Sequence, residues 1–326
     1  MKSNFRKFYF LIILSIFFAN KVFSLTFKNG EAQIDLINLK FNSGYFKQIS
    51  AKEDYSYQPE STNVRSGSIS QRFEIHHGDC GQDPGWSDCL NDRQRVERGY
   101  DTNLWKDQIV WYGFSVYLPQ NFEAISPSNT ILGQVKLVSY RQPLWNFYVS
   151  KDIFFFEANA SFSKCDLIPT KDMLGKWTDI ALGVDYSTDK GFLMGGYEKN
   201  YFYELWVNGN KVNCNLAGKP VLTKKMINET QRDRVDFHFD WGIYHSYVSR
   251  WLDKNKTKAL NLEGFTDKHE DSGIVVSSKT NSPFEFDWGV EIPTQTVYYD
   301  EIRIGPTRQS VDVRILEKKL DFIPVD

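Results

Sequence analysis

Beyond its first two dozen residues, the sequence lacks any apolar run long enough to cross a bilayer. The one long apolar run, FYFLIILSIFFA at residues 8–19, follows the basic residues Lys2, Arg6 and Lys7. A transmembrane helix needs about 20 apolar residues, whereas a secretory signal peptide needs only about 7–15 after a basic start. We therefore expect residues 1–24 to be a signal peptide cleaved after Ser24. The mature protein is then secreted or periplasmic, with no membrane contact.

A basic excess is also absent. The chain has 39 Lys and Arg against 41 Asp and Glu, and residues 1–24 hold four of the basic residues and none of the acids. The remaining chain therefore has 35 basic and 41 acidic residues, a net charge of −6. Nucleic-acid-binding domains usually carry a basic surface, so we expect no nucleic-acid partner. There is no glycine-rich phosphate-binding loop either, and thus no sign of a nucleotide.

Cysteine is scarce, with only Cys80, Cys89, Cys165 and Cys214. Export permits disulfides, and four cysteines allow three pairings. The short spacing favours a bond between Cys80 and Cys89, which leaves Cys165 with Cys214. A zinc site is the weaker alternative, because eight residues separate the first two cysteines where zinc sites usually have two to four.

Helical periodicity is rare, and alternating, β-branched or aromatic segments dominate. The pair Asn208-Gly209 predicts a hairpin, because both central positions of a type I′ turn need positive φ. No linker or internal repeat divides residues 25–326, which predicts one all-β domain, an antiparallel jelly-roll sandwich with a concave groove. The segments predicted as strands are 69–77, 109–118, 130–140, 153–158, 177–186, 201–207, 235–239, 284–288 and 296–304.

Three of these regions carry polar side chains on one face. In TILGQVKLVSY, a period of two places Gln134 and Lys136 opposite the apolar residues Ile131, Val135 and Leu137. In DRQRVER, the residues Arg93, Arg95 and Glu97 alternate onto a common side. Each pattern alone is equally typical of an ordinary solvated strand.

The third region is FHFDWGIYHSYVSRW, residues 237–251. If the strand is regular, Tyr244, Ser246 and Arg250 share one side, and Gly242 allows a ligand or backbone to approach closely. A tyrosine in such a strand more often packs than reacts, so this region alone predicts no chemistry.

Taken in order, the three regions resemble the jelly-roll polysaccharide lyases, in particular the heparin-lyase-I-like and glucuronan-lyase-like branch. RQRVER is similar to the R-S-E-L strand of that family, ILGQVK to its Q-x-H strand and FDWGIY to its K-x-G-x-Y strand. The stretches QRFEI, WYGFSVYLP, WTDIALGVDYS, YELWVNGN and VYYDEIRIG complete the resemblance, which covers most of residues 69–305. It implies a concanavalin A-like jelly-roll sandwich that spans residues 25–326 and cleaves an acidic, uronate-containing polysaccharide by β-elimination.

The resemblance also implies roles. Arg95 and Gln134 neutralise the uronate carboxylate, which must happen before the neighbouring C5 proton can leave. Tyr244 is the acid and, in a tyrosine-only mechanism, also the base. We expect the cations Arg95, Lys136 and Arg250 to favour its phenolate form. No cofactor is required.

Two positions depart from the family pattern. Lys136 stands where the family has histidine, and Asp240 stands where it has lysine. The general base is therefore open between Lys136, if its pKa falls well below about 10.4, Tyr244 itself, and the histidines His245, His76 and His77. Strict alternation points His245 away from Tyr244.

Further residues are expected around the site. We assign Arg93, Arg72, His245, Arg250 and Trp86 to substrate binding. Hard carboxylate ligands in and beside the loop between Cys80 and Cys89 suit a structural calcium ion, held by Asp79, Asp83 and Asp88. The protein is expected to be a monomer.

Two other functions stay open. A non-catalytic glycan-binding sandwich would explain the substitutions at Lys136 and Asp240. A glycoside hydrolase could use Glu285 and Glu291, which share a strand face with Asp287. However, those glutamates would lie about 20 Å apart along a strand, and glycosidase carboxyl pairs lie within about 10 Å.

Overall fold

The computed structural model describes residues 25–28, 31–34, 46–50, 53–79, 82–83, 86–88, 93–105, 109–137, 143–159, 163–186, 203–214, 234–255, 267–268, 275–276 and 291–320. The predicted signal peptide and the strand expected at 284–288 lie outside these residues. No helix in the described part of the chain is both long enough and apolar enough to cross a membrane.

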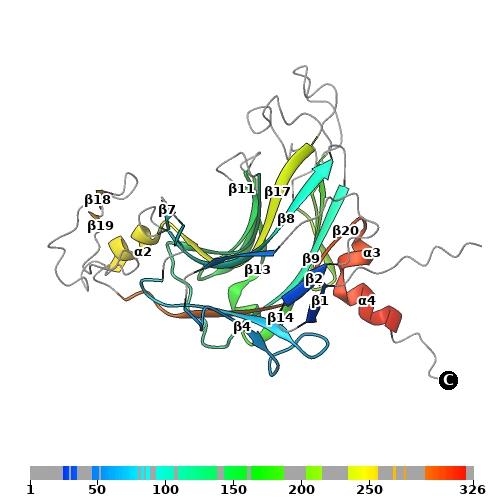
Figure 1. Cartoon of the computed structure of the whole chain (residues 1–326), viewed down its shortest axis with the longest axis horizontal. Helices are drawn as coiled ribbons and strands as arrows, with labels where there is room; N and C mark the ends of the chain where they lie inside the picture. Colours follow the sequence, from blue (N-terminus) through cyan, green and yellow to red (C-terminus); the bar gives the residue numbers. More distant parts are fainter. Residues whose placement is uncertain are drawn as a thin grey trace, which may run out of the picture.

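Two seven-stranded antiparallel sheets form the body of the molecule (Figure 1). The first, called the front sheet, has the order β13 (Ser163–Pro169), β12 (Ile153–Ala158), β11 (Pro143–Val149), β10 (Asn129–Leu137), β17 (Arg234–Ser246), β8 (Arg93–Trp105) and β3 (Phe46–Ser50). The second, called the back sheet, has the order β16 (Asn210–Val212), β15 (Tyr203–Val207), β14 (Lys176–Asp185), β9 (Ile109–Leu118), β20 (Gln295–Gly305), β5 (Ser70–Ile75) and β4 (Tyr57–Glu60). The all-β jelly-roll sandwich predicted from the sequence is confirmed.

The remaining elements are short. Three two-stranded ribbons pair β1 (Leu25–Lys28) with β2 (Glu31–Ile34), β6 (Gln82–Asp83) with β7 (Trp86–Ser87), and β18 (Asp267–Lys268) with β19 (Val275–Val276). The helices are η3 (Thr170–Asp172), α2 (Val248–Asn255), α3 (Arg308–Val311) and α4 (Val313–Leu320). Helix α3 packs on β20 and β9 of the back sheet, and Figure 1 shows α4 next to α3.

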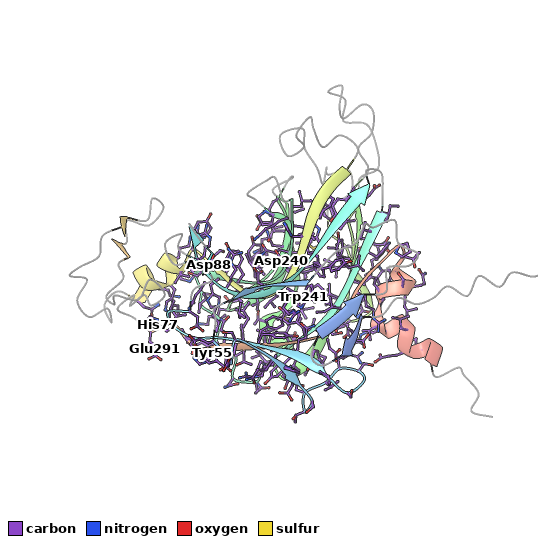
Figure 2. All side chains as sticks on the ribbon, in the orientation of Figure 1. Tyr55, His77, Asp88, Asp240, Trp241 and Glu291 are labelled. Carbon is purple, nitrogen blue, oxygen red and sulfur yellow. A yellow bond between two sulfur atoms is a disulfide. The ribbon has the colours of Figure 1, made fainter. Side chains whose placement is uncertain are left out.

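The core between the sheets is rich in aromatic side chains. Strand β17 shows how alternation builds it, because Phe237, Phe239, Trp241 and Ile243 are all buried in the core while Asp240 lies outside the core cluster. Figure 2 labels Asp240 and Trp241, which are consecutive and project to opposite sides of the strand. The inner face of the front sheet thus belongs to the core. Its outer face follows the concave curve of β17 and β8 in Figure 1.

A disulfide links the two sheets at one edge. Cys165 on β13 and Cys214, just after β16, are bonded, with Cα atoms 5.5 Å apart. Strands β13 and β16 are edge strands of the front and back sheets. The predicted Cys165–Cys214 pairing is confirmed, whereas Cys80 and Cys89 lie outside the described residues.

Candidate active site on the outer face of the front sheet

Three neighbouring strands bring the predicted catalytic residues together. Strand β17 lies between β10 and β8, and Tyr244 pairs with Ile131 on one side and with Arg95 on the other. Further along the same two strands, Gln134 of β10 pairs with Asp240 of β17. Arg95, Gln134, Lys136 and Tyr244 therefore share the outer face of the front sheet.

A β-bulge on β10 sets this alignment. The register skips Leu132 between the pairs formed by Ile131 and by Gly133, so Ile131 pairs with the outer-face Tyr148 while Gly133 pairs with the core residue Phe147. A bulge places two successive residues on one face and reverses the alternation beyond it. The predicted common core face of Ile131 and Val135 is thus wrong, because Leu132 fills the core place instead.

A tyrosine of the back sheet clamps the bulge. The hydroxyl oxygen of Tyr299, on β20, lies 2.7 Å from the main-chain carbonyl oxygens of Leu132 and Gly242. Gly242 has φ +138°, and a Cβ there would lie 2.3 Å from the carbonyl oxygen of Val96. Any other residue would clash with β8 here, so only glycine fits.

Arg95 is held by an acid partner that the sequence did not assign to it. Its Nε and Nη2 donate to the two carboxylate oxygens of Asp88 at 2.6 and 2.7 Å, and Nη1 donates to Glu97 at 3.5 Å. Both Arg95 and Asp88 are buried. Asp88 therefore occupies the fork that was expected to bind the substrate carboxylate, and a bidentate buried pair of this kind fixes the guanidinium.

The fixed guanidinium lies against Tyr244. The Arg95 Cζ is 4.2 Å from the centre of the Tyr244 ring, within the range of a cation–π contact. Burial nevertheless raises the pKa of the Tyr244 phenol, although Arg95 and Arg93 act to lower it. The expectation that nearby cations favour phenolate is therefore wrong in its net direction. The hydroxyl keeps its proton and suits a proton donor.

Lys136 lies on the other side of this cluster. Its Nζ is 5.2 Å from the centre of the Tyr244 ring. Burial lowers the pKa of the Lys136 ammonium, and Arg95 lowers it further. This direction is the one that a lysine base requires, because more of the amine is neutral at a given pH.

Three polar residues of the site were missed as site residues. Glu97 is fully buried and accepts a hydrogen bond from Gln134 Nε2 at 2.7 Å. Asp240 and Asn146 are also buried, and side-chain atoms of both lack a hydrogen-bond partner among the described residues. Glu97 was visible in the sequence as the alternating neighbour of Arg95, whereas Asn146 carried no signal in PLWNFYV.

Burial raises the pKa of the Glu97 carboxyl to about 7, and the Asp240 carboxylate adds to this effect. A glutamic acid ordinarily titrates near 4.3. Glu97 therefore holds its proton to a higher pH than an ordinary glutamate does.

Two of the arginines assigned to substrate binding meet at Tyr247. The Cζ atoms of Arg93 and Arg250 each lie 4.2 Å from the centre of its ring. Strand β17 ends at Ser246, Tyr247 has φ +57°, and α2 begins at Val248. The expected continuous strand through Arg250 is thus wrong, because a left-handed residue turns the chain into a helix.

His245 and Arg72 do not lie on this face. The His245 ring is fully buried between the sheets, with its nitrogens 3.0 and 2.8 Å from the side-chain oxygens of Gln94 and Gln295. Burial lowers its pKa to about 4. Arg72 lies on β5 of the back sheet and pairs with Glu74. Neither residue contacts a ligand on the outer face of the front sheet, because alternation and sheet membership place them elsewhere.

The other two histidines considered as bases also have partners outside the candidate active site. His76 pairs with Glu74 at 2.7 Å, and Nδ1 of His77 accepts a hydrogen bond from the amide of Ile292. Figure 2 shows His77 beside Glu291, away from Asp240.

Two of the three expected calcium ligands have described side chains, and both bind protein groups instead. Asp88 binds Arg95, and Asp79 accepts hydrogen bonds from the Tyr55 hydroxyl and the His76 amide. Asp83 lies on β6 and Trp86 on β7, but their side chains are outside the described set. Within the described residues, no group of three His, Cys, Asp or Glu side chains could hold a metal ion.

Comparison with known families agrees with this geometry. Residues 41–303, more than half of the chain, match the family model described as polysaccharide lyase. The chain belongs to the polysaccharide lyase family. No curated protein matches the sequence of this lyase.

Solved structures resemble the lyase only distantly. They include an alginate lyase of polysaccharide lyase family 7, at 10% identity and TM-score 0.41 over 78% of this chain and 83% of that one. Alginate lyase A1-II′ follows at 8% identity and TM-score 0.38, over 72% and 79%. A GH131 β-glucanase catalytic domain from Podospora anserina gives 9% identity and TM-score 0.43, over 81% and 86%. Resemblance at this level carries no information about the substrate.

Proposed function

We propose that this polysaccharide lyase cleaves a uronate-containing glycan by β-elimination on the outer face of the front sheet. The carrying observation is the pair of basic side chains around Tyr244, with Arg95 at 4.2 Å and Lys136 at 5.2 Å from its ring centre. Family membership supports a lyase, and the ordered motifs of the sequence support a substrate of the heparin or glucuronan type.

The reaction needs a base, an acid and a group that neutralises the carboxylate. In our proposal the neutral amine of Lys136 removes the C5 proton, and the C–H electrons form the C4=C5 double bond. The C4–O bond breaks, and its oxygen takes the proton of the Tyr244 hydroxyl. The resulting ammonium and phenolate then return to their starting forms by net proton transfer.

The pKa directions support this division of labour. Burial raises the pKa of Tyr244 and lowers that of Lys136. The phenol thus stays protonated while the amine loses its proton more readily, which is the order that an acid and a base need. The carboxylate is then left to Gln134, because Asp88 already occupies two donors of Arg95.

The proposal also includes the compartment in which the protein acts. The Cys165–Cys214 disulfide supports a protein that folds in an oxidising compartment. Together with the signal-like start of the sequence, it supports secretion or periplasmic export.

A panel of acidic polysaccharides tests the function. Incubation with the preferred polyuronate should increase ultraviolet absorbance, because the new C4=C5 bond is conjugated with the carboxylate. New reducing ends without absorbance would indicate a hydrolase instead. Saturable binding with neither product would indicate a glycan-binding protein, and either result would reject the proposal.

A further inference from the structure

The amide of Gln134 is turned toward Glu97 rather than toward a substrate. Its Nε2 donates to Glu97 Oε1 at 2.7 Å, while its own Oε1 is buried and has no hydrogen-bond partner among the described residues. A carboxylate that accepts from Nε2 leaves the carbonyl oxygen on the other side of the amide. A carbonyl oxygen repels a uronate carboxylate, so this orientation opposes the role proposed for Gln134.

The charges around Glu97 raise the same difficulty. The acids of the cluster are Asp88, Glu97 and Asp240, and its basic side chains are Arg93, Arg95 and Lys136; Tyr244 is neutral. On β3, the residue paired with Glu97 is the apolar Ile49. With the Lys136 amine neutral, as the proposed elimination requires, three acids face two arginines before any substrate arrives. A uronate would add a fourth negative charge, and an uncompensated buried charge is strongly unfavourable.

One proton on Glu97 removes both difficulties. A protonated carboxyl is a hydrogen-bond donor as well as an acceptor, so it can donate to the carbonyl oxygen of a turned Gln134 amide. The amide nitrogen is then released toward the outer face. The raised pKa of Glu97 favours this protonation, because burial disfavours the charged carboxylate.

We propose that Glu97 is a proton-linked positioning residue that takes up one proton when the substrate carboxylate binds and thereby turns the Gln134 amide toward it. The inference rests on the proposed function, since it concerns binding of a uronate at the same site. The proton comes from solvent and is released with the product, so no other bond changes.

The pH dependence of KM tests the linkage. In the wild-type lyase, KM for a polyuronate should rise above about pH 7, by up to tenfold per pH unit, because ionised Glu97 must first gain a proton. In Glu97→Gln, the side-chain amide of residue 97 can donate to Gln134 Oε1 at every pH. Its KM should therefore stay flat over the same range. A merely structural role would lower stability without removing this slope.

Calorimetry measures the proton directly. Binding of a uronate oligosaccharide to Tyr244→Phe near pH 8, in two buffers of different ionisation enthalpy, should show uptake of close to one proton. The double variant with Glu97→Gln should show none. The matched control is Glu204→Gln on β15 of the back sheet, where Glu204 accepts from Trp206 Nε1 and pairs with Lys211. That variant should keep the uptake.

The outcomes separate the two proposals. Turnover with a pH-independent KM, or binding without proton uptake, would overturn the role of Glu97 and leave the lyase function standing. If Glu97→Gln fails to fold, proton uptake by the Tyr244→Phe protein decides alone. Absence of both binding and turnover on every polyuronate would reject the lyase function and this inference with it.

Discussion

The guanidinium of Arg95 lies over the ring of Tyr244, with its Cζ 4.2 Å from the ring centre, while Asp88 accepts two hydrogen bonds from it. The arginine therefore acts on the tyrosine more than on a ligand. It places a fixed positive charge beside the phenol, where it moderates the rise in pKa that burial causes. This cation would also stabilise the phenolate that forms after proton donation.

Removal of the Tyr244 hydroxyl should stop turnover with little loss of binding. In Tyr244→Phe we expect kcat to fall by about 10²–10⁴-fold, the usual contribution of a general acid, while KM changes little. Initial rates of ultraviolet absorbance measure this. Tyr298→Phe on the back sheet removes a hydroxyl far from the site and serves as control. A variant at position 244 that keeps more than about a tenth of kcat would exclude Tyr244 as the acid.

Loss of the proton from Lys136 should control the increase of kcat with pH. Since burial and Arg95 lower its pKa, kcat should increase with pH and level off below the ordinary lysine value near 10.4. Lys136→Met should lose at least about 10²-fold. Lys136→His should keep activity and move the rise toward the imidazole pKa near 6.5. The pH–rate profiles of the three proteins decide, and an unchanged profile in Lys136→His would remove Lys136 as the base.

Loss of the Asp88 carboxylate should destabilise the fold. Asp88→Asn leaves the Arg95 charge buried without its main partner, and breaking a buried pair typically costs about 3–5 kcal/mol. Urea denaturation measures the free energy of unfolding. Asp166→Asn breaks the exposed pair with Lys164 and should cost less than about 1 kcal/mol. Equal effects in the two variants would contradict the structural role of Asp88.

His245 should make the protein sensitive to acid. Its pKa is about 4 in the folded state and near 6.5 in the unfolded chain. Between these values the unfolded state binds a proton that the native state does not. Stability from this group is therefore present above about pH 6.5 and falls by up to about 3 kcal/mol as the pH drops toward 4. Unfolding free energies across that range should show a shallower acid slope in His245→Gln. An identical slope would show that the native ring is protonated as readily as the unfolded one.

Local sequence patterns predicted much of the sandwich. Strand β9, Ile109–Leu118, and strand β12, Ile153–Ala158, lie where alternation and β-branched residues placed them. The hairpin at Asn208-Gly209 is confirmed by φ values of +52° and +77°. Such features depend on backbone propensity and on the period of two, both of which are local.

The site was less predictable, because it depends on contacts between distant segments. The bulge at Leu132 reverses the face of Ile131, and nothing in TILGQVK marks it. The turn at Tyr247 ends β17 and precedes α2, although the sequence YHSYVSRW was interpreted as one continuous strand. The partner of Arg95 lies in a loop, so Asp88 looked like one of several calcium ligands until the fold brought it to the guanidinium. Composition alone cannot show which acid a buried cation selects.

The clamp formed by Tyr299 means that a residue of the back sheet helps to align the candidate active site on the front sheet. Its hydroxyl reaches across the interior to the carbonyl groups of Leu132 and Gly242, so one back-sheet residue contacts both of the strands that carry Gln134 and Tyr244. The relative position of these two strands therefore depends on the back sheet. A substitution in the back sheet should lower activity without changing any residue on the outer face of the front sheet.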